Sequence, residues 1–195
     1  MLFADIRGFT RLAESLGTDA TIELLREFHE RVTRIVFDHG GTLEKYIGDA
    51  VMATFGTPSR GVDDAGRALQ CAWRLADETH RWSLERVKRG EAPVDLGLGV
   101  HYGEAVLGSI GDAQRLDYVV VGDTVNVASR LERLTRDLGV ELVVSDAVVG
   151  RIREVGRLVG LRLDRLKPGG EVHLTGRMRP ITIWTAGRHS TVRSA

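Results

Sequence analysis

The spacing of apolar residues predicts three long helices separated by short strands. Apolar positions recur every three to four residues over 18–39, 62–87 and about 122–138, as on a helix with one buried face. Short apolar or alternating runs predict strands at residues 2–5, 42–47, 50–55, 94–102, 105–110, 116–121 and 141–144. Ser145 caps a further short helix, and the alternating tail turns at residues 167–170, which predicts a closing hairpin. Long helices joined to hairpins fit an α/β (α+β) fold, with one mixed sheet and helices packed on it.

Composition limits the kinds of partner that we expect. The chain has 195 residues, 43% of them hydrophobic, which is enough for one substantial core and one domain. Its 27 Lys and Arg balance its 27 Asp and Glu, so the formal net charge is zero. A balanced chain has no overall field that attracts nucleic acid or an anionic membrane, so we expect neither as a partner. Local groups must therefore hold any anionic substrate.

Cysteine usage and hydropathy indicate a reducing compartment. Cys71 is the single cysteine, which excludes an internal disulfide, and its apolar surroundings predict a small buried side chain. No apolar run approaches the roughly 18 residues that a membrane span needs. Asp5 and Arg7 stand where a signal peptide would need an apolar segment. We expect a cytoplasmic protein.

The first candidate site is the stretch 3–10, Phe-Ala-Asp-Ile-Arg-Gly-Phe-Thr. Asp5 ends a strand, and Gly8 turns the chain into a helix. Backbone N–H groups at a helix start attract phosphate, and Mg²⁺ prefers carboxylate and phosphate oxygens. Taken alone, the pattern favours an aspartate that only caps the next helix.

The second candidate is the stretch 43–50, Leu-Glu-Lys-Tyr-Ile-Gly-Asp-Ala. Gly-Asp between two apolar strands is usually only a hairpin turn, and Lys45 alone fits an exposed strand lysine. If this hairpin pairs with the first strand, however, Asp49 could meet Asp5. Two carboxylates around two Mg²⁺ ions would suit phosphoryl transfer.

The third candidate is the stretch 118–132, which contains Asn126 and Arg130. These residues stand four apart on a predicted helix and therefore share a face. An amide and a guanidinium that project together could orient a ribose and stabilise charge on a transferring phosphoryl group. Taken alone, Asn126 also fits a helix cap region, and Arg130 a surface residue paired with Glu132 or Glu141.

Together and in this order, the three stretches resemble the class III adenylyl and guanylyl cyclases, and the similarity runs over most of the chain. The resemblance implies a cyclase-type catalytic domain with a ferredoxin-like mixed sheet and a C-terminal extension. It implies two Mg²⁺ or Mn²⁺ ions per active site. Their ligands would be Asp5, Asp49 and the backbone carbonyl of Ile6.

The resemblance also assigns contacts with the nucleotide. Lys45 would recognise adenine, Asn126 would orient the ribose, and Arg130 would stabilise the transition state. The contacts with the phosphates would come from Gly8, Phe9 and Thr10 and, near the end of the chain, from Arg177.

Two residues depart from the family pattern. Adenylyl cyclases usually pair the lysine with an aspartate or threonine seven residues before the asparagine, where this chain has Val119. A backbone carbonyl near Val119 could read adenine instead. Many relatives also have an arginine at the position of Gly97, and its absence would weaken triphosphate binding.

The resemblance therefore implies an adenylyl cyclase that converts ATP to 3′,5′-cyclic AMP and pyrophosphate. The ribose 3′-oxygen would attack the α-phosphorus in line. Guanylyl cyclase activity on GTP is the nearest alternative, although guanylyl cyclases usually have glutamate at the position of Lys45. An inactive, nucleotide-binding regulatory homologue is the second alternative, and the intact Asp5, Asp49, Asn126 and Arg130 argue against it.

Family geometry further implies a homodimer with composite active sites. One subunit would supply the metal aspartates, and the other the base-reading residues, the asparagine and the arginine. We expect residues 114–121 to help build this dimer. We also expect residues 1–195 to be one catalytic domain of a longer signalling protein, without membrane contacts of its own.

Overall fold

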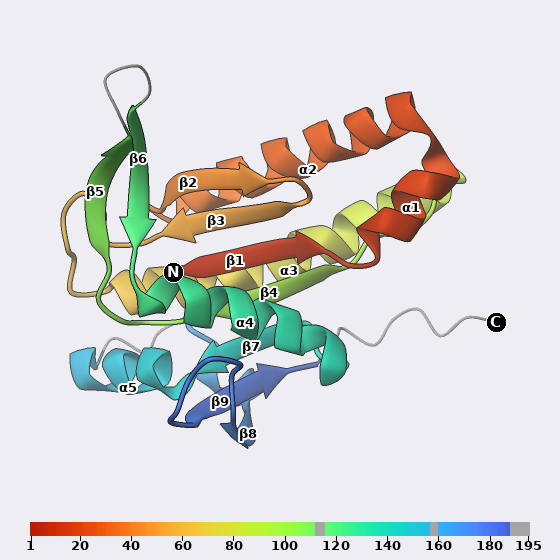
Figure 1. Ribbon diagram of the computed structural model, residues 1–195. Helices are drawn as coiled ribbons and strands as arrows, with labels where there is room; N and C mark the ends of the chain where they lie inside the picture. Colours follow the sequence, from red (N-terminus) through yellow and green to blue (C-terminus); the bar gives the residue numbers. More distant parts are fainter. Residues whose placement is uncertain (112–115, 157–159, 188–195) are drawn as a thin grey trace.

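The computed structural model describes residues 1–111, 116–156 and 160–187 (Figure 1). Its helices are α1 (Phe9–Leu16), α2 (Thr18–Asp38), α3 (Asp64–Lys88), α4 (Asp123–Asp137) and α5 (Asp146–Val155), with a short 3-10 helix at Leu163–Arg165. Its strands are β1 (Leu2–Ile6), β2 (Thr42–Ile47), β3 (Ala50–Thr54), β4 (Leu96–Val100), β5 (Val106–Gly111), β6 (Leu116–Val121), β7 (Leu142–Ser145), β8 (Lys167–Val172) and β9 (Ile181–Ala186). Most element ends lie within one or two residues of the predicted ones.

Seven strands form one mixed sheet in the order β2-β3-β1-β4-β7-β9-β8. β4 and β7 are parallel, and the other neighbouring strands of this sheet are antiparallel. β5 and β6 pair with each other and extend from the body as a separate hairpin (Figure 1). The predicted fold class, a mixed sheet with helices packed on it, is confirmed.

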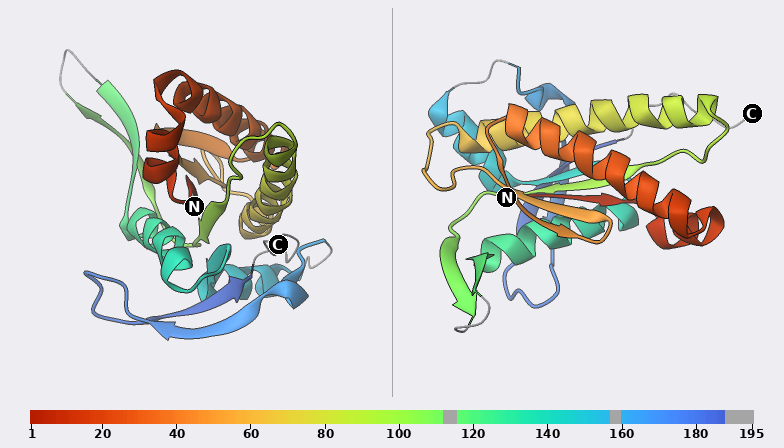
Figure 2. Two further views of the ribbon diagram at one scale, coloured as in Figure 1. Left: turned by 90° about the vertical axis from the view of Figure 1, so that its right-hand side faces the viewer. Right: turned by 90° about the horizontal axis from the view of Figure 1, so that it is seen from above.

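The sheet has two different faces because successive side chains of a strand point to opposite sides. Three alternate residues of β1 join the main core beneath α2 and α3: Leu2, Ala4 and Ile6. Phe3 lies on the other face, where it clusters with Ala128 of α4. Asp5 shares this second face by the same alternation. Figure 2 shows α4 on the opposite side of the sheet from α2 and α3.

Two glycines of β4 let α4 approach the sheet closely. A Cβ atom at Gly99 would lie 2.4 Å from the backbone nitrogen of Glu132 and 2.5 Å from the carbonyl oxygen of Ala128. A Cβ atom at Gly97 would lie 2.5 Å from Oε1 of Glu132. These glycines therefore set the distance between α4 and the sheet, and with it the position of every side chain that α4 carries.

Replacing Gly99 with alanine should destabilise the protein by about 1–3 kcal/mol, the usual range for overpacking. The atoms that would collide belong to the backbone of α4 and cannot rotate away. Gly150 in α5 is the matched control, because its Cβ would meet open space and alanine in a helix is favoured by about 0.5–1 kcal/mol over glycine. Urea unfolding measures both changes. A Gly99→Ala variant as stable as the wild type would contradict the close packing of α4.

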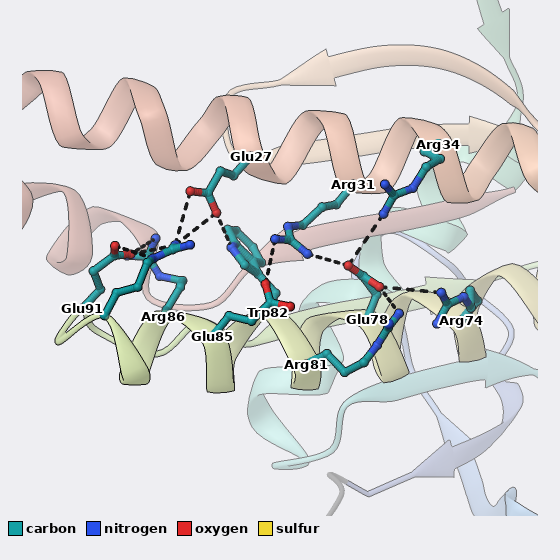
Figure 3. A network of polar contacts seen from close by, with 11 residues as sticks. Glu27, Arg31, Arg34, Arg74, Glu78, Arg81, Trp82, Glu85, Arg86 and Glu91 are labelled. Carbon is teal, nitrogen blue, oxygen red and sulfur yellow. Dashed lines mark hydrogen bonds and ion pairs between the residues drawn. The ribbon is translucent and has the colours of Figure 1, made fainter.

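A polar network joins α2 to α3 on the side of the molecule away from α4 (Figure 3). Trp82 of α3 is 2% exposed, and its Nε1–H donates to Oε2 of Glu27 at 2.5 Å. The buried carboxylate of Glu78 accepts a hydrogen bond from Arg31 of α2 at 2.6 Å. It is also ion-paired with Arg34, Arg74 and Arg81. The two helices thus form a connected layer behind the sheet.

The tail differs from the sequence prediction in one respect. Residues 167–170, which we predicted to be a turn, lie within β8. The register against β9 shifts between Pro168 and Gly170. Because β8 is an edge strand, proline and glycine here mark an irregularity in the strand and not its end. The connection of the closing hairpin is residues 173–180 instead.

Candidate active site

Asp5 and Asp49 come together at one end of β1. β1 pairs with β3 so that Asp5 stands opposite Ala50, the residue after Asp49. The backbone N–H of Ile6 donates to the carbonyl oxygen of Asp49 at 3.2 Å. The two side chains are close enough that Asp49 raises the pKa of Asp5. Pairing of the β2–β3 hairpin with β1 is thus what unites two acids that are distant in the sequence.

The surroundings of Asp5 carry an excess of negative charge. Asp5 is 9% exposed, and its pKa is raised to about 7, mainly by burial. Glu132 and Asp49 contribute to this rise in pKa, whereas the charge of Arg136 opposes it. A divalent cation would offset this crowding of carboxyl groups.

The donor set fits Mg²⁺ or Mn²⁺ completed by a substrate. No group of three His, Cys, Asp or Glu side chains arranged for a metal ion occurs in the described part of the chain. Mg²⁺ is typically held by one or two carboxylates, with waters and substrate phosphates filling its remaining positions. Asp5 and Asp49 match that pattern, and Ile6 follows Asp5 at the end of β1.

Sequence analysis missed two residues beside this pair. Arg136 of α4 forms an ion pair with Asp5, and its Nη2 lies 3.9 Å from Oε1 of Glu132. Glu132 is 5% exposed, burial raises its pKa, and Oε1 has no hydrogen-bond partner among the described residues. The prediction considered Glu132 only as a partner of Arg130. The available signal was the spacing of four between Glu132 and Arg136 on one helix.

The turn from β1 into α1 offers backbone N–H groups next to the aspartates. Gly8 adopts a left-handed conformation with φ 65°, which glycine accepts without strain. No described side chain caps α1, so the N–H groups of its first turn are available to an anion such as phosphate. Phe9 packs partly against the main core, which anchors the turn, while Thr10 is exposed.

Arg7 fastens the end of α4 to this turn. Its Nε donates to the carbonyl oxygen of Leu96 at 3.1 Å, and its Nη2 donates to the carbonyl oxygen of Thr135 at 3.2 Å. Nη2 also donates to the carbonyl oxygen of Val140. A guanidinium at a helix C-terminus is favoured because the carbonyl dipoles there carry negative charge. Arg7 thus holds the last turn of α4 beside β1.

Lys45 and Val119 are not presented to each other within one chain. Lys45 is exposed on β2, opposite Met52 of β3. On β6, Val120 packs in the same cluster as Met52. Val119 is the residue before Val120 on this strand and therefore points the other way.

The β8–β9 connection brings Arg177 close to the first half of α4, which carries Asn126 and Arg130. Asn126 is exposed and Arg130 is partly exposed. A Cβ atom at Gly176, in the β8–β9 connection, would lie 3.3 Å from Nη2 of Arg130. Arg177 pairs with Asp123, the first residue of α4, at 3.4 Å. Two guanidinium groups thus lie along the first half of α4, and the one from Arg177 lies at the helix start.

One copy of the chain presents two separate groups of candidate residues. Around α4, the pair Asn126 and Arg130 is rotated by roughly 120° from the pair Glu132 and Arg136. Arg130 and Arg136 are also about 9 Å apart along the helix axis. Arg136 reaches Asp5, so Arg130 projects elsewhere. A single chain therefore does not bring Asn126 and Arg130 to the aspartates.

The β5–β6 hairpin exposes apolar surface away from the body. Val106 is 70% exposed, Val121 is 50% exposed and Leu107 is 39% exposed. Exposed apolar side chains gathered on one projecting element are typical of an interaction surface. In the segment that we expected to build a dimer, residues 114 and 115 lie outside the described residues, and the rest forms β6.

A cavity of about 420 Å³ lies elsewhere, at the other end of β1. Its lining includes Met1, Tyr102 and Arg151, and none of the candidate residues described above. Asp5 and Asp49 do not line this cavity.

Comparison with known proteins gives consistent matches. Residues 1–186 match the family model described as the adenylate and guanylate cyclase catalytic domain. Adenylate cyclase 1 of Rhizobium meliloti is 30% identical over 183 residues, which cover 94% of this chain and 26% of that protein. The crystal structure of the adenylyl cyclase CyaB from P. aeruginosa superposes with a TM-score of 0.81 at 28% identity, covering 100% of this chain and 93% of that one. The crystal structure of the guanylyl cyclase Cya2 superposes with a TM-score of 0.78 at 28% identity, covering 97% and 91%.

The chain spans only part of its curated relatives. It covers 26% to 33% of the length of the first three, so their other segments have no counterpart in the residues described. Across the described residues, every helix is too short or too polar to span a bilayer.

Proposed function

Because the chain belongs to the family of adenylate and guanylate cyclase catalytic domains, we propose that it is an adenylyl cyclase. It converts ATP to 3′,5′-cyclic AMP and pyrophosphate. The observation that supports this most is the meeting of Asp5 and Asp49 at the end of β1, beside an uncapped helix start. Such a pair suits divalent cations and a triphosphate together.

In the proposed reaction, the ribose 3′-oxygen bonds to the α-phosphorus, the bond from that phosphorus to the pyrophosphate oxygen breaks, and the hydroxyl proton is lost. Two Mg²⁺ or Mn²⁺ ions, when bound, favour loss of this proton and neutralise the phosphates. Asp5, Asp49 and the carbonyl of Ile6 hold the ions. Phosphate oxygens accept hydrogen bonds at the turn formed by Gly8, Phe9 and Thr10.

The remaining groups act on the ribose and on the developing charge. Asn126 orients the ribose, Arg130 stabilises the charge that develops at the transition state, and Arg177 contacts a phosphate. Because α4 directs Asn126 and Arg130 away from the aspartates of its own chain, these residues serve a second copy. The active unit is then a homodimer with two composite sites, and the exposed β5–β6 hairpin contributes to its interface.

The same proposal extends to the whole protein in general terms. The curated relatives are roughly two and a half to three and a half times as long as this chain. We therefore propose that residues 1–195 are the catalytic domain of a longer signalling protein. Because the proposed substrate is ATP, we place the reaction in the cytoplasm.

Incubation with ATP or GTP and Mn²⁺ tests the substrate, and Lys45→Glu tests its recognition. We expect ATP to be preferred, because the Lys45 ammonium can only donate hydrogen bonds and suits the ring-nitrogen acceptors of adenine. Lys45→Glu should lower kcat/KM for ATP by about 10- to 100-fold, since a lost or unpaired hydrogen bond to a charged group costs about 1.5–3 kcal/mol.

Lys88→Glu is the matched control, since this exposed residue at the end of α3 undergoes the same change in charge. It should leave kcat/KM unchanged. The similarity to the guanylyl cyclase Cya2 keeps GTP as the second candidate substrate. A strong preference of the wild type for GTP would establish that alternative, whereas no cyclic product from either nucleotide would refute the proposed activity.

A further inference from the structure

Arg136 lies against Asp5 and neutralises the carboxylate charge that would attract a cation there. Its guanidinium is bound to Oδ2 of Asp5, whose side chain is 12% exposed, while the Arg136 side chain is 51% exposed. A divalent cation in contact with the same carboxylate would repel this guanidinium strongly. The contact of Arg136 with Asp5 therefore opposes binding of a cation to the same carboxylate.

A second place for Arg136 already exists on its own helix. Glu132 is one turn earlier on α4, and its Oε1 lies 3.9 Å from Nη2 of Arg136. That oxygen is buried and has no hydrogen-bond partner among the described residues, which is costly for a carboxylate. Arg136 is already within ion-pair distance of this second carboxylate.

Gly97 keeps the path between the two carboxylates open. In the sheet it stands opposite Asp5, and a Cβ atom there would lie 2.5 Å from Oε1 of Glu132. Any larger residue would therefore fill the space next to that oxygen. With glycine, Arg136 can exchange one carboxylate for the other over a short distance.

We infer that Arg136 and Glu132 are a positioning pair for the cation site, in which Arg136 binds Asp5 in the metal-free protein and Glu132 when cations are bound. The inference rests on the proposed function in one point, that Asp5 is a cation ligand. Arg136 lowers the apparent cation affinity, because the competent form is only part of the population. Glu132 raises it by giving Arg136 another partner.

Calorimetric titration of the 195-residue chain with Mn²⁺ alone, without nucleotide, tests this inference. Arg136→Gln should bind Mn²⁺ about three- to tenfold more tightly, because the competing ion pair is gone. Glu132→Gln should bind it about three- to tenfold more weakly, because Arg136 loses its second partner.

The double variant separates exchange of partners from simple electrostatics. If Glu132 acts through Arg136, then Glu132→Gln should have little further effect once Arg136→Gln is present. If the two substitutions acted only through general electrostatics, their effects on Mn²⁺ affinity would instead add in the double variant. Arg133→Gln is the matched control, because this neighbouring arginine is exposed on the same helix and undergoes the same change in charge. Its effect should stay below about twofold.

Each result then has a defined meaning. Tighter binding by Arg136→Gln together with a non-additive double variant supports the pair. Mn²⁺ binding that depends on Asp5 but is unaffected by Arg136→Gln, or is affected equally by Arg133→Gln, overturns this inference and leaves the proposed function intact. Absence of Mn²⁺ binding without nucleotide overturns this inference alone, because substrate phosphates would complete the cation site of the proposed enzyme. Mn²⁺ binding that persists unchanged in Asp5→Asn overturns both.

Discussion

Asp5→Asn should abolish formation of cyclic nucleotide and at the same time stabilise the metal-free protein. The amide cannot supply the negative charge that holds a divalent cation, so we expect activity to fall at least a thousandfold, more than the roughly 10²–10³ attributed to one lost electrostatic contact. The fold should tolerate the change, because asparagine keeps the shape and the polar atoms of the side chain. Turnover with Mn²⁺ and ATP, together with thermal unfolding in a chelator, measures both effects.

The pH dependence follows from the raised pKa of Asp5. Burial and the neighbouring carboxylates hold this pKa at about 7 in the folded protein, above the unfolded value near 3.8. The folded state therefore binds the proton more tightly, and stability falls as the pH rises from about 4 to about 7. Asp5→Asn does not undergo this loss of stability. Its stability should therefore equal that of the wild type near pH 4, and its gain over the wild type should be complete above pH 7. We expect its unfolding midpoint at pH 8 to be higher by roughly 2–6 °C.

Asp38→Asn provides the control for Asp5→Asn, because Asp38 is an exposed aspartate at the end of α2. It should keep full activity. A residue that serves only the fold would behave in the opposite way to Asp5, with lower stability and partial activity. Substantial Mn²⁺-dependent activity in Asp5→Asn would therefore remove this carboxylate from the reaction.

Much of the fold could be predicted because its determinants are local. The alternation in residues 2–5 assigns Phe3 and Asp5 to one side of a strand, whatever packs above them. Gly48 and Asp49 between two apolar strands predict the hairpin, and that hairpin delivers Asp49 to β1. The proline and glycines at 167–170 misled the prediction, because the same residues break a strand and mark an irregularity within one.

The missing parts of the site depend on tertiary packing. Arg136 and Asp5 are 131 residues apart, and their contact requires both the register of β1 against β4 and the height of α4 above them. No local pattern sets that height, which is decided by Gly97 and Gly99. In the sequence, both glycines are only unusual residues for a strand, and Gly97 also departs from the family pattern. Their role in the packing of α4 is not visible there. Glu132 was visible as a charge, but its burial was not.

Arg130→Ala should lower kcat by about a hundred- to a thousandfold, because removal of a pre-positioned charge at the transition state costs about 2.7–4 kcal/mol. KM should change little, since Arg130 is assigned to charge that develops only during the reaction. Arg130 is partly exposed, so stability should stay close to that of the wild type. Arg133→Ala, three residues further along α4 and exposed, is the control and should keep full activity.

A mixture of Arg130→Ala and Asp5→Asn should recover activity that neither variant has alone. In a homodimer with composite sites, a mixed dimer holds one site with both defects and one site with none. Random exchange makes about half of the dimers mixed, and each has one of two sites intact, so about a quarter of wild-type activity should return. The structure supports this arrangement because α4 turns Arg136 toward the aspartates of its own chain and Arg130 away from them. A mixture as inactive as its components would instead place Arg130 and Asp5 in the same subunit's site, against the geometry of α4.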